Sequence, residues 1–155
     1  MAALEESEFE EARRGHRPFA DLEWFASDES GHIAAFVTAG FAAIPLCAFD
    51  RNLPFAALHQ LIDRLSATSG ALPVDQDQGR NQSFVEFAAK GLFVYDWNHA
   101  FGSYHADLPY RLMTRPDRPI HASDLGLQNS LPMIPVAFED HLEIVVERYF
   151  SKLNL

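Results

Sequence analysis

The clearest pattern in the chain is a pair of β-prone runs separated by a short polar turn. The runs cover residues 22–27 and 32–38, and the segment Asp28-Glu29-Ser30-Gly31 lies between them. Aspartate at the first position and glycine at the fourth are typical of a type I turn in a four-residue hairpin loop. Hydrophobic side chains occur on both faces of each run. We therefore expect a β-hairpin that is covered on both sides and exposed only at its tip.

Helical periodicity appears in three places. Apolar residues recur at three- and four-residue spacing over 55–65, which predicts the longest helix. A shorter helix is predicted for 84–90. The polar stretch 4–14 predicts a short helix within a frayed N-terminal region that covers residues 1–17.

Further strands are predicted downstream of these helices. Residues 92–96 are apolar on both faces at their start, which favours a central strand, and a second strand is predicted near 108–113. Residues 142–146 fit a strand by alternation and a helix by spacing, and we favour the helix because Glu and Arg flank the apolar positions. The stretches 39–53 and 71–82 are predicted as loops.

No internal repeat, low-complexity tract or long linker divides the chain. The 155 residues are 48% hydrophobic and include thirteen phenylalanines, enough to bury a substantial core. The sequence therefore predicts one globular domain over residues 1–155. Its expected class is α+β, an antiparallel or mixed sheet with two to three helices packed against it.

The net charge narrows the classes of partner. Twelve Lys and Arg against 22 Asp and Glu give −10, which argues against a nucleic-acid partner and favours a basic protein partner. Arg111, Arg115 and Arg118, with Asp117 among them, fit a solvated loop better than a phosphate site. No apolar run reaches the roughly 18–20 residues of a membrane span, and no secretory leader is visible, so no membrane partner and a cytoplasmic location are expected.

The segment from Asp75 to Glu86 resembles part of a calcium loop. It places oxygen-bearing side chains at positions one, three, nine and twelve of an EF-hand pattern. However, Arg80 occupies the sixth position, where the sharp turn needs glycine. Ser83 and Glu86 also form a capping-box pattern that would open the following helix, and we favour this interpretation.

Catalytic motifs are scarce. Asp28 and Glu29 lie on the expected hairpin tip, and Cys47 lies among apolar residues that favour an inert thiol, so we expect no enzyme activity and no cofactor. The alternative is a metal-binding protein or metal-dependent enzyme that uses His99, His105 and Asp107, because imidazole and carboxylate groups are common metal ligands. The six-residue gap between the two histidines matches no specific ligand spacing, and surface or interface roles are favoured for them.

A set of aromatic and acidic residues is the candidate partner-binding surface. Trp and Tyr dominate the energetically important contacts of protein interfaces, and carboxylates around them would favour a basic face on the partner. Tyrosines in this segment equally fit half-buried core positions with a solvated hydroxyl. The candidate residues are Asp96, Trp97, Tyr104, Asp107 and Tyr110.

The hairpin over residues 24–40, with Asp28, Gly31 and Gly40, resembles a pattern in small bacterial proteins of unknown activity. Some of these are similar to immunity proteins of polymorphic-toxin systems. Residues 92–96 and 116–125 are compatible with the resemblance. It implies a related fold and stoichiometric binding of a cognate toxin without a cofactor, and it assigns no toxin-contacting residue.

The sequence as a whole predicts a non-catalytic protein-binding module. The concrete case is an immunity protein that neutralises a basic toxin. The metal-dependent alternative stays open, and a homo-oligomeric structural component is the third interpretation.

Overall fold

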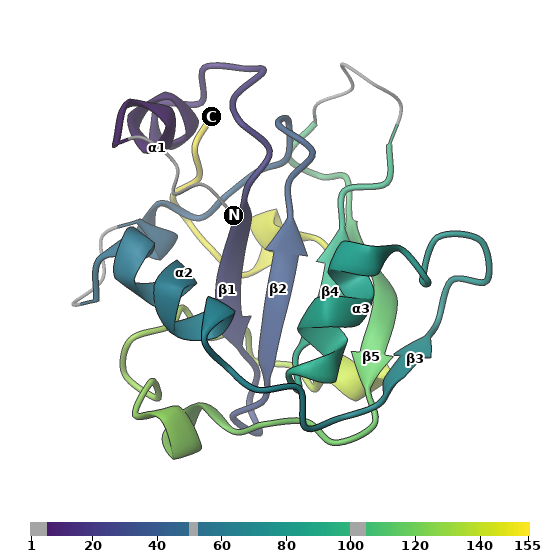
Figure 1. Cartoon of the computed structure of the whole chain (residues 1–155). Helices are drawn as coiled ribbons and strands as arrows, with labels where there is room; N and C mark the ends of the chain where they lie inside the picture. Colours follow the sequence, from purple (N-terminus) through teal and green to yellow (C-terminus); the bar gives the residue numbers. More distant parts are fainter. Residues whose placement is uncertain (1–5, 50–52, 100–104) are drawn as a thin grey trace.

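The computed structural model describes residues 6–49, 53–99 and 105–155, and it confirms the predicted α+β class (Figure 1). This part of the chain contains three α-helices and one mixed sheet of six strands. None of these helices has the length and apolar character needed to cross a membrane. The elements are α1 (Glu6–Arg13), β1 (Glu23–Ser27), β2 (Ile33–Val37), α2 (Phe55–Asp63), β3 (Ala71–Pro73), α3 (Gln82–Ala89), β4 (Phe93–Asp96), β5 (Tyr110–Pro116) and β6 (Glu143–Ile144).

The sheet has the strand order β1-β2-β4-β5-β3, and β6 also pairs with β5. Strands β1 and β2 form the predicted antiparallel hairpin, and β2 and β4 are parallel. The pairs that β5 makes with β3, β4 and β6 are all antiparallel. The central position predicted for residues 92–96 is confirmed, because β4 lies between β2 and β5.

The two faces of the sheet are covered by different parts of the chain, as expected for the hairpin. Helices α2 and α3 lie in front of one face, which we call the helical face (Figure 1). The opposite face carries the buried rings of Trp24, Phe36, Tyr95 and Tyr110, and we call it the aromatic face. Both faces are closed by apolar packing, so the sheet lies inside the protein.

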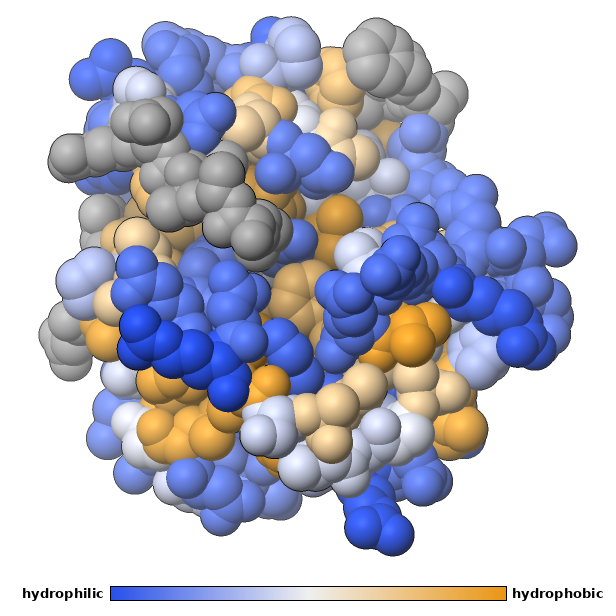
Figure 2. Space-filling model, in the orientation of Figure 1, coloured by the Kyte–Doolittle hydropathy of each residue, from blue (hydrophilic) through white to orange (hydrophobic). Residues whose placement is uncertain are grey.

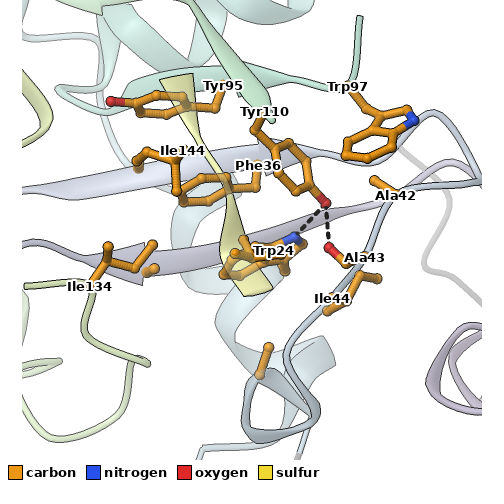
Figure 3. Packing of buried hydrophobic residues seen from close by; sticks show 14 of the residues in the cluster. Trp24, Phe36, Ala42, Ala43, Ile44, Tyr95, Trp97, Tyr110, Ile134 and Ile144 are labelled. Atoms are coloured by element: carbon orange, nitrogen blue, oxygen red, sulfur yellow. Dashed lines mark hydrogen bonds between the residues drawn. The ribbon is translucent and has the colours of Figure 1, made fainter. Parts of the chain in front are cut away.

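The aromatic face is held by ring stacking and by a buried hydrogen-bond chain (Figure 3). The ring centroid of Phe36 lies 4.3 Å from that of Trp24 and 5.1 Å from that of Tyr95. The Trp24 indole N–H donates to the Tyr110 hydroxyl at 3.0 Å, and this hydroxyl donates to the Ala43 carbonyl at 2.9 Å. The polar atoms of these two buried rings are thereby satisfied.

The hairpin tip is less exposed than the sequence predicted. Asp28 is only 2% exposed, and its carboxylate accepts hydrogen bonds from the main-chain N–H groups of Ser30, His32 and Phe138 at 2.9, 2.9 and 3.0 Å. The expected exposure is therefore wrong for Asp28, although Glu29 is exposed. The side chain turns inward because it binds the turn and the C-terminal segment together.

The C-terminal segment is a strand and not the helix that we favoured. Strand β6 pairs with β5, with Tyr110 opposite Ile144, and the Leu112 N–H donates to the Leu142 carbonyl at 2.8 Å. A single 3₁₀ turn, Val146–Arg148, follows. The edge of β5 offers main-chain partners to this segment, and those long-range hydrogen bonds outweigh its local helical preference.

Candidate functional site

The structure places the predicted partner-binding residues in different environments. Trp97 is 4% exposed and Tyr110 is 0% exposed, so both belong to the core beneath the aromatic face. Asp107 is exposed, and Asp96 is half-buried at the end of β4. Tyr104 lies outside the described residues. The expected aromatic surface is therefore not formed by Trp97 and Tyr110, and Asp96 and Asp107 are the accessible members of the set.

The predicted metal ligands are not brought together. His99 Nε2 lies 2.7 Å from the carbonyl oxygen of Pro109, while His105 and Asp107 are exposed. Across residues 6–49, 53–99 and 105–155, no group of three or more His, Cys, Asp or Glu side chains is arranged to hold a metal ion.

The calcium-like segment forms a turn and a helix cap. Asp75 Oδ1 accepts from the main-chain N–H groups of Asp77 and Gln78 at 2.9 and 2.7 Å, which closes the turn. The cap of α3 is Asn81, whose Oδ1 accepts from the Ser83 N–H at 3.0 Å. The capping box predicted at Ser83 is therefore wrong, and the helix begins at Gln82, just after the asparagine cap.

A different site lies on the helical face, in a groove that runs beside α3 and reaches Asp63 at the C-terminal end of α2. Two adjoining cavities form it, one of about 420 Å³ and one of about 80 Å³, and Ser83 lines both. Figure 2 shows a hollow there, with hydrophilic side chains around it and hydrophobic side chains at its floor. We call this the acidic groove, and its carboxylates are Asp21, Glu23, Asp63, Asp77, Glu86 and Asp96.

The sheet register brings the floor of the acidic groove together. Val37, the last residue of β2, lies opposite Glu23 of β1 on one side and Asp96 of β4 on the other. Directly paired residues point to the same face of a sheet, so these three side chains form a row across three strands. Asp21 lies just before β1, and its Oδ1 accepts from the Ala39 N–H at 2.9 Å.

Burial perturbs the carboxyl groups of this row. It raises the pKa of Glu23 to about 7 and that of Asp96 to about 6, and the charge of Asp21 raises both further. Burial likewise raises the pKa of Asp21. Among the described residues, no lysine or arginine forms an ion pair with these three groups, so desolvation of the charged form is the dominant cause.

Among the described residues, one cationic side chain lines the acidic groove, and its ammonium group already donates hydrogen bonds. The ammonium group of Lys90 donates to the main-chain carbonyls of Ile62 and Asp63 at 3.2 and 3.1 Å. It thereby satisfies the C-terminal carbonyls of α2. The groove thus concentrates negative charge over an apolar floor that includes Val37 and Phe84, and this combination attracts a cation that carries hydrophobic surface.

Sequence reasoning singled out four groove residues for other roles. Asp96 was assigned to a different surface, and Asp77, Ser83 and Glu86 to the calcium-like segment. Asp21 and Asp63 carry no local signal, because distant segments bring them together. Glu23 carries a weak one, since it is a charged residue in a strand that is apolar on both faces. No protein-family model, curated protein or solved structure matches the chain. The interpretation of the groove therefore depends on its own geometry.

Proposed function

We propose that the protein is a binding module whose acidic groove receives a basic segment of a protein partner. The observation that carries this proposal is the uncompensated charge on the groove floor. Asp21 and the half-buried Asp96 line the larger cavity, and neither forms an ion pair with a lysine or arginine among the described residues. An arginine or lysine side chain from a partner would supply the missing charge, and its aliphatic stem would lie against Val37 and Phe84.

The dimensions of the groove favour side chains presented by an extended or helical segment. The larger cavity, about 420 Å³, is of the size that accommodates a small ligand or a few side chains. The smaller cavity continues along α3 past Glu86. A segment with several basic residues would thus meet carboxylates along the whole length of the groove.

The net charge of −10 supports the same choice of partner. Long-range attraction accelerates the encounter with a basic protein and weakens as salt screens it. Neutralisation of a basic toxin, which the resemblance of the hairpin implies, is the concrete version of this proposal. In that version, the groove would hold a basic segment of the toxin and block its function by occupancy.

The first test uses a short arginine-rich peptide as the probe and a glutamate-rich peptide of the same length as its counterpart. We expect the arginine-rich peptide to bind and to shift the amide resonances of β1, the end of β4 and α3. The double variant Asp21→Asn/Asp96→Asn removes two negative charges from the groove and should weaken this binding about tenfold or more. This factor corresponds to a loss of about 1.4 kcal/mol or more in binding free energy. Fluorescence anisotropy at low and high salt measures both effects.

The matched control is Asp124→Asn/Asp140→Asn, which removes the same charge from exposed positions outside the groove. It should bind the peptide nearly as the wild type does. Equal weakening by both double variants would show that only net charge matters and would exclude the groove as the site. A partner captured from native cells should likewise be retained by the control and lost by the groove variant.

A further inference from the structure

Beside the acidic groove, His59 of α2 faces the carboxyl group of Glu23 but forms no hydrogen bond with it. His59 Nδ1 lies 3.0 Å from the Phe55 carbonyl oxygen, one turn earlier in the helix. Its other ring nitrogen, Nε2, is fully buried and has no hydrogen-bond partner within the described residues. The nearest carboxylate oxygen is Oε2 of Glu23, at 3.9 Å.

The hydrogen bond to Phe55 determines the tautomer of this histidine. A carbonyl oxygen only accepts hydrogen bonds, so Nδ1 carries the hydrogen. In the neutral ring, Nε2 is then a bare acceptor that points toward Glu23. If Glu23 is ionised, two acceptors face each other in a buried space. If the pair holds one proton, the carboxyl group of Glu23 can donate to Nε2 after a small approach.

The surroundings favour a pair that holds one proton. Burial lowers the pKa of His59, and the rings of Phe9, Phe25 and Phe55 pack around its imidazole. The main-chain carbonyls of Phe55 and Glu23 oppose this effect because they favour the charged ring. The apolar rings thus disfavour a second proton on the pair.

Charged groups from each neighbouring element surround Glu23. Asp21 lies just before its own strand, Asp63 comes from α2, Glu86 comes from α3, and Lys90 directly follows α3. Burial and the charges of Asp21 and Asp63 all raise the pKa of Glu23, to about 7, while its own main-chain N–H lowers it. The ammonium of Lys90 is engaged with the end of α2.

We propose that Glu23 and His59 form a proton-sharing latch that holds α2 against β1 in mildly acidic and neutral solution and loosens when the shared proton is lost. In the latched form, the carboxyl hydrogen of Glu23 bonds to Nε2 of His59. Loss of this hydrogen to solvent leaves a buried carboxylate opposite the lone pair of Nε2. That arrangement weakens the contact between the first residue of β1 and the middle of α2. This latch does not depend on the proposed partner.

Two measurements on the full chain test the latch. Long-range ¹H–¹⁵N spectra of His59 report which nitrogen carries hydrogen, and hydrogen-exchange protection factors of the α2 amides report opening of the helix. We expect the hydrogen on Nδ1 at neutral pH and a change at Nε2 with a midpoint near pH 7. Protection in α2 should fall between pH 6 and pH 8.5, by no more than about 300-fold, the factor that separates a pKa of about 7 from 4.5.

The variant Glu23→Gln keeps a donor opposite Nε2 and removes the titration, so its α2 protection should be independent of pH over this range. Glu86→Gln removes a carboxylate from the same small cavity and should behave as the wild type does. A His59 ring with its hydrogen on Nε2 at neutral pH would overturn the latch. The same pH dependence of α2 protection in all three proteins would also overturn it.

Discussion

Carboxylates are withdrawn from solvent at both ends of the β1–β2 hairpin, but the number of hydrogen bonds that they accept differs between the two ends. At the tip, three main-chain N–H groups donate to the carboxylate of Asp28. At the other end, Glu23 and Asp96 lie in the acidic groove, and burial raises the pKa of both. One end of the hairpin therefore holds a carboxylate with several main-chain donors, and the other end lies beside carboxylates, on β1 and β4, that are poorly compensated.

This difference separates the structural role of Asp28 from the binding role that we propose for the acidic groove. A buried charge that receives several main-chain hydrogen bonds is a stable tie between segments. A buried charge without matched donors lowers the stability of the free protein. Such groups are expected where a ligand later supplies the missing partner, and the acidic groove fits that description.

The largest expected effect is at the tip. Asp28→Ala removes the acceptor of one buried and two partly buried N–H groups and should lower the free energy of unfolding by about 3–5 kcal/mol. Glu29→Ala, at the neighbouring exposed position, should change it by less than about 0.5 kcal/mol. Urea denaturation followed by circular dichroism measures both. Similar losses for the two variants would contradict the structural role of Asp28.

At the groove end, we expect the removal of a carboxylate to stabilise the protein, and not to destabilise it as at the tip. Because the folded-state pKa of Glu23, about 7, lies above its ordinary value of 4.5, the folded protein binds the extra proton within this window. The contribution of Glu23 to stability is thus fully present below pH 4.5 and is lost as the pH rises through 7. Glu23→Gln should therefore stabilise the protein by about 1–3 kcal/mol at pH 8 and have little effect at pH 4.5.

His59 acts in the opposite direction, because its lowered pKa reduces stability as the pH falls below 6.5. Chemical denaturation at a series of pH values measures the difference between Glu23→Gln and wild type, with Glu86→Gln as the control. A stabilisation that does not change with pH would show that the pKa of Glu23 is the same in the folded and the unfolded protein.

The sequence was informative about elements and uninformative about the groove. The hairpin, the two main helices and the central strand were predicted correctly, because their apolar periodicity and turn residues are local signals. The strand β6 was missed, since its pairing with β5 joins segments more than thirty residues apart. The short strand β3 was missed for the same reason, because its pairing with β5 is also long-range.

The acidic groove could not be predicted because it is a product of topology. Asp21, Asp63 and Asp96 come from three segments, and only the parallel pairing of β2 with β4 and the packing of α2 and α3 bring them together. The sequence also did not show which of the candidate side chains would be buried. Trp97 and Tyr110 have the composition of an interface, but the register of β4 and β5 turns both into the core.

Asp96 allows a smaller test at the groove end. Its pKa is raised from 3.8 to about 6 by burial and by Asp21, so its contribution to stability is lost as the pH rises from 3.8 through 6. Asp96→Asn should stabilise the free protein by about 1–2 kcal/mol at pH 7.5. Asp107→Asn, at an exposed position, should have no measurable effect. Destabilisation by Asp96→Asn at this pH would show that the carboxylate makes a favourable contact in the free protein.

The smallest expected effect concerns the turn beside Asp21. Ala39 has a φ of 53°, a left-handed conformation that costs a residue with a side chain about 1 kcal/mol. Ala39→Gly should therefore stabilise the protein by about 0.5–1 kcal/mol, while Ala56→Gly, at an exposed position of α2, should destabilise it by about the same amount. Thermal and urea denaturation at pH 7.5 measure both changes.

The Ala39 N–H donates to Asp21 Oδ1, so this turn and the acidic groove are physically connected. The change Asp21→Ala, measured with and without Ala39→Gly, tests that connection. If Asp21 holds the strained turn, its removal should cost more stability when Ala39 is present than when the turn is relaxed by glycine. Equal costs in the two backgrounds would show that the turn keeps its shape without Asp21. Asp21 would then contribute only its negative charge at the open end of the hairpin, whereas Asp28 holds the tip together through hydrogen bonds.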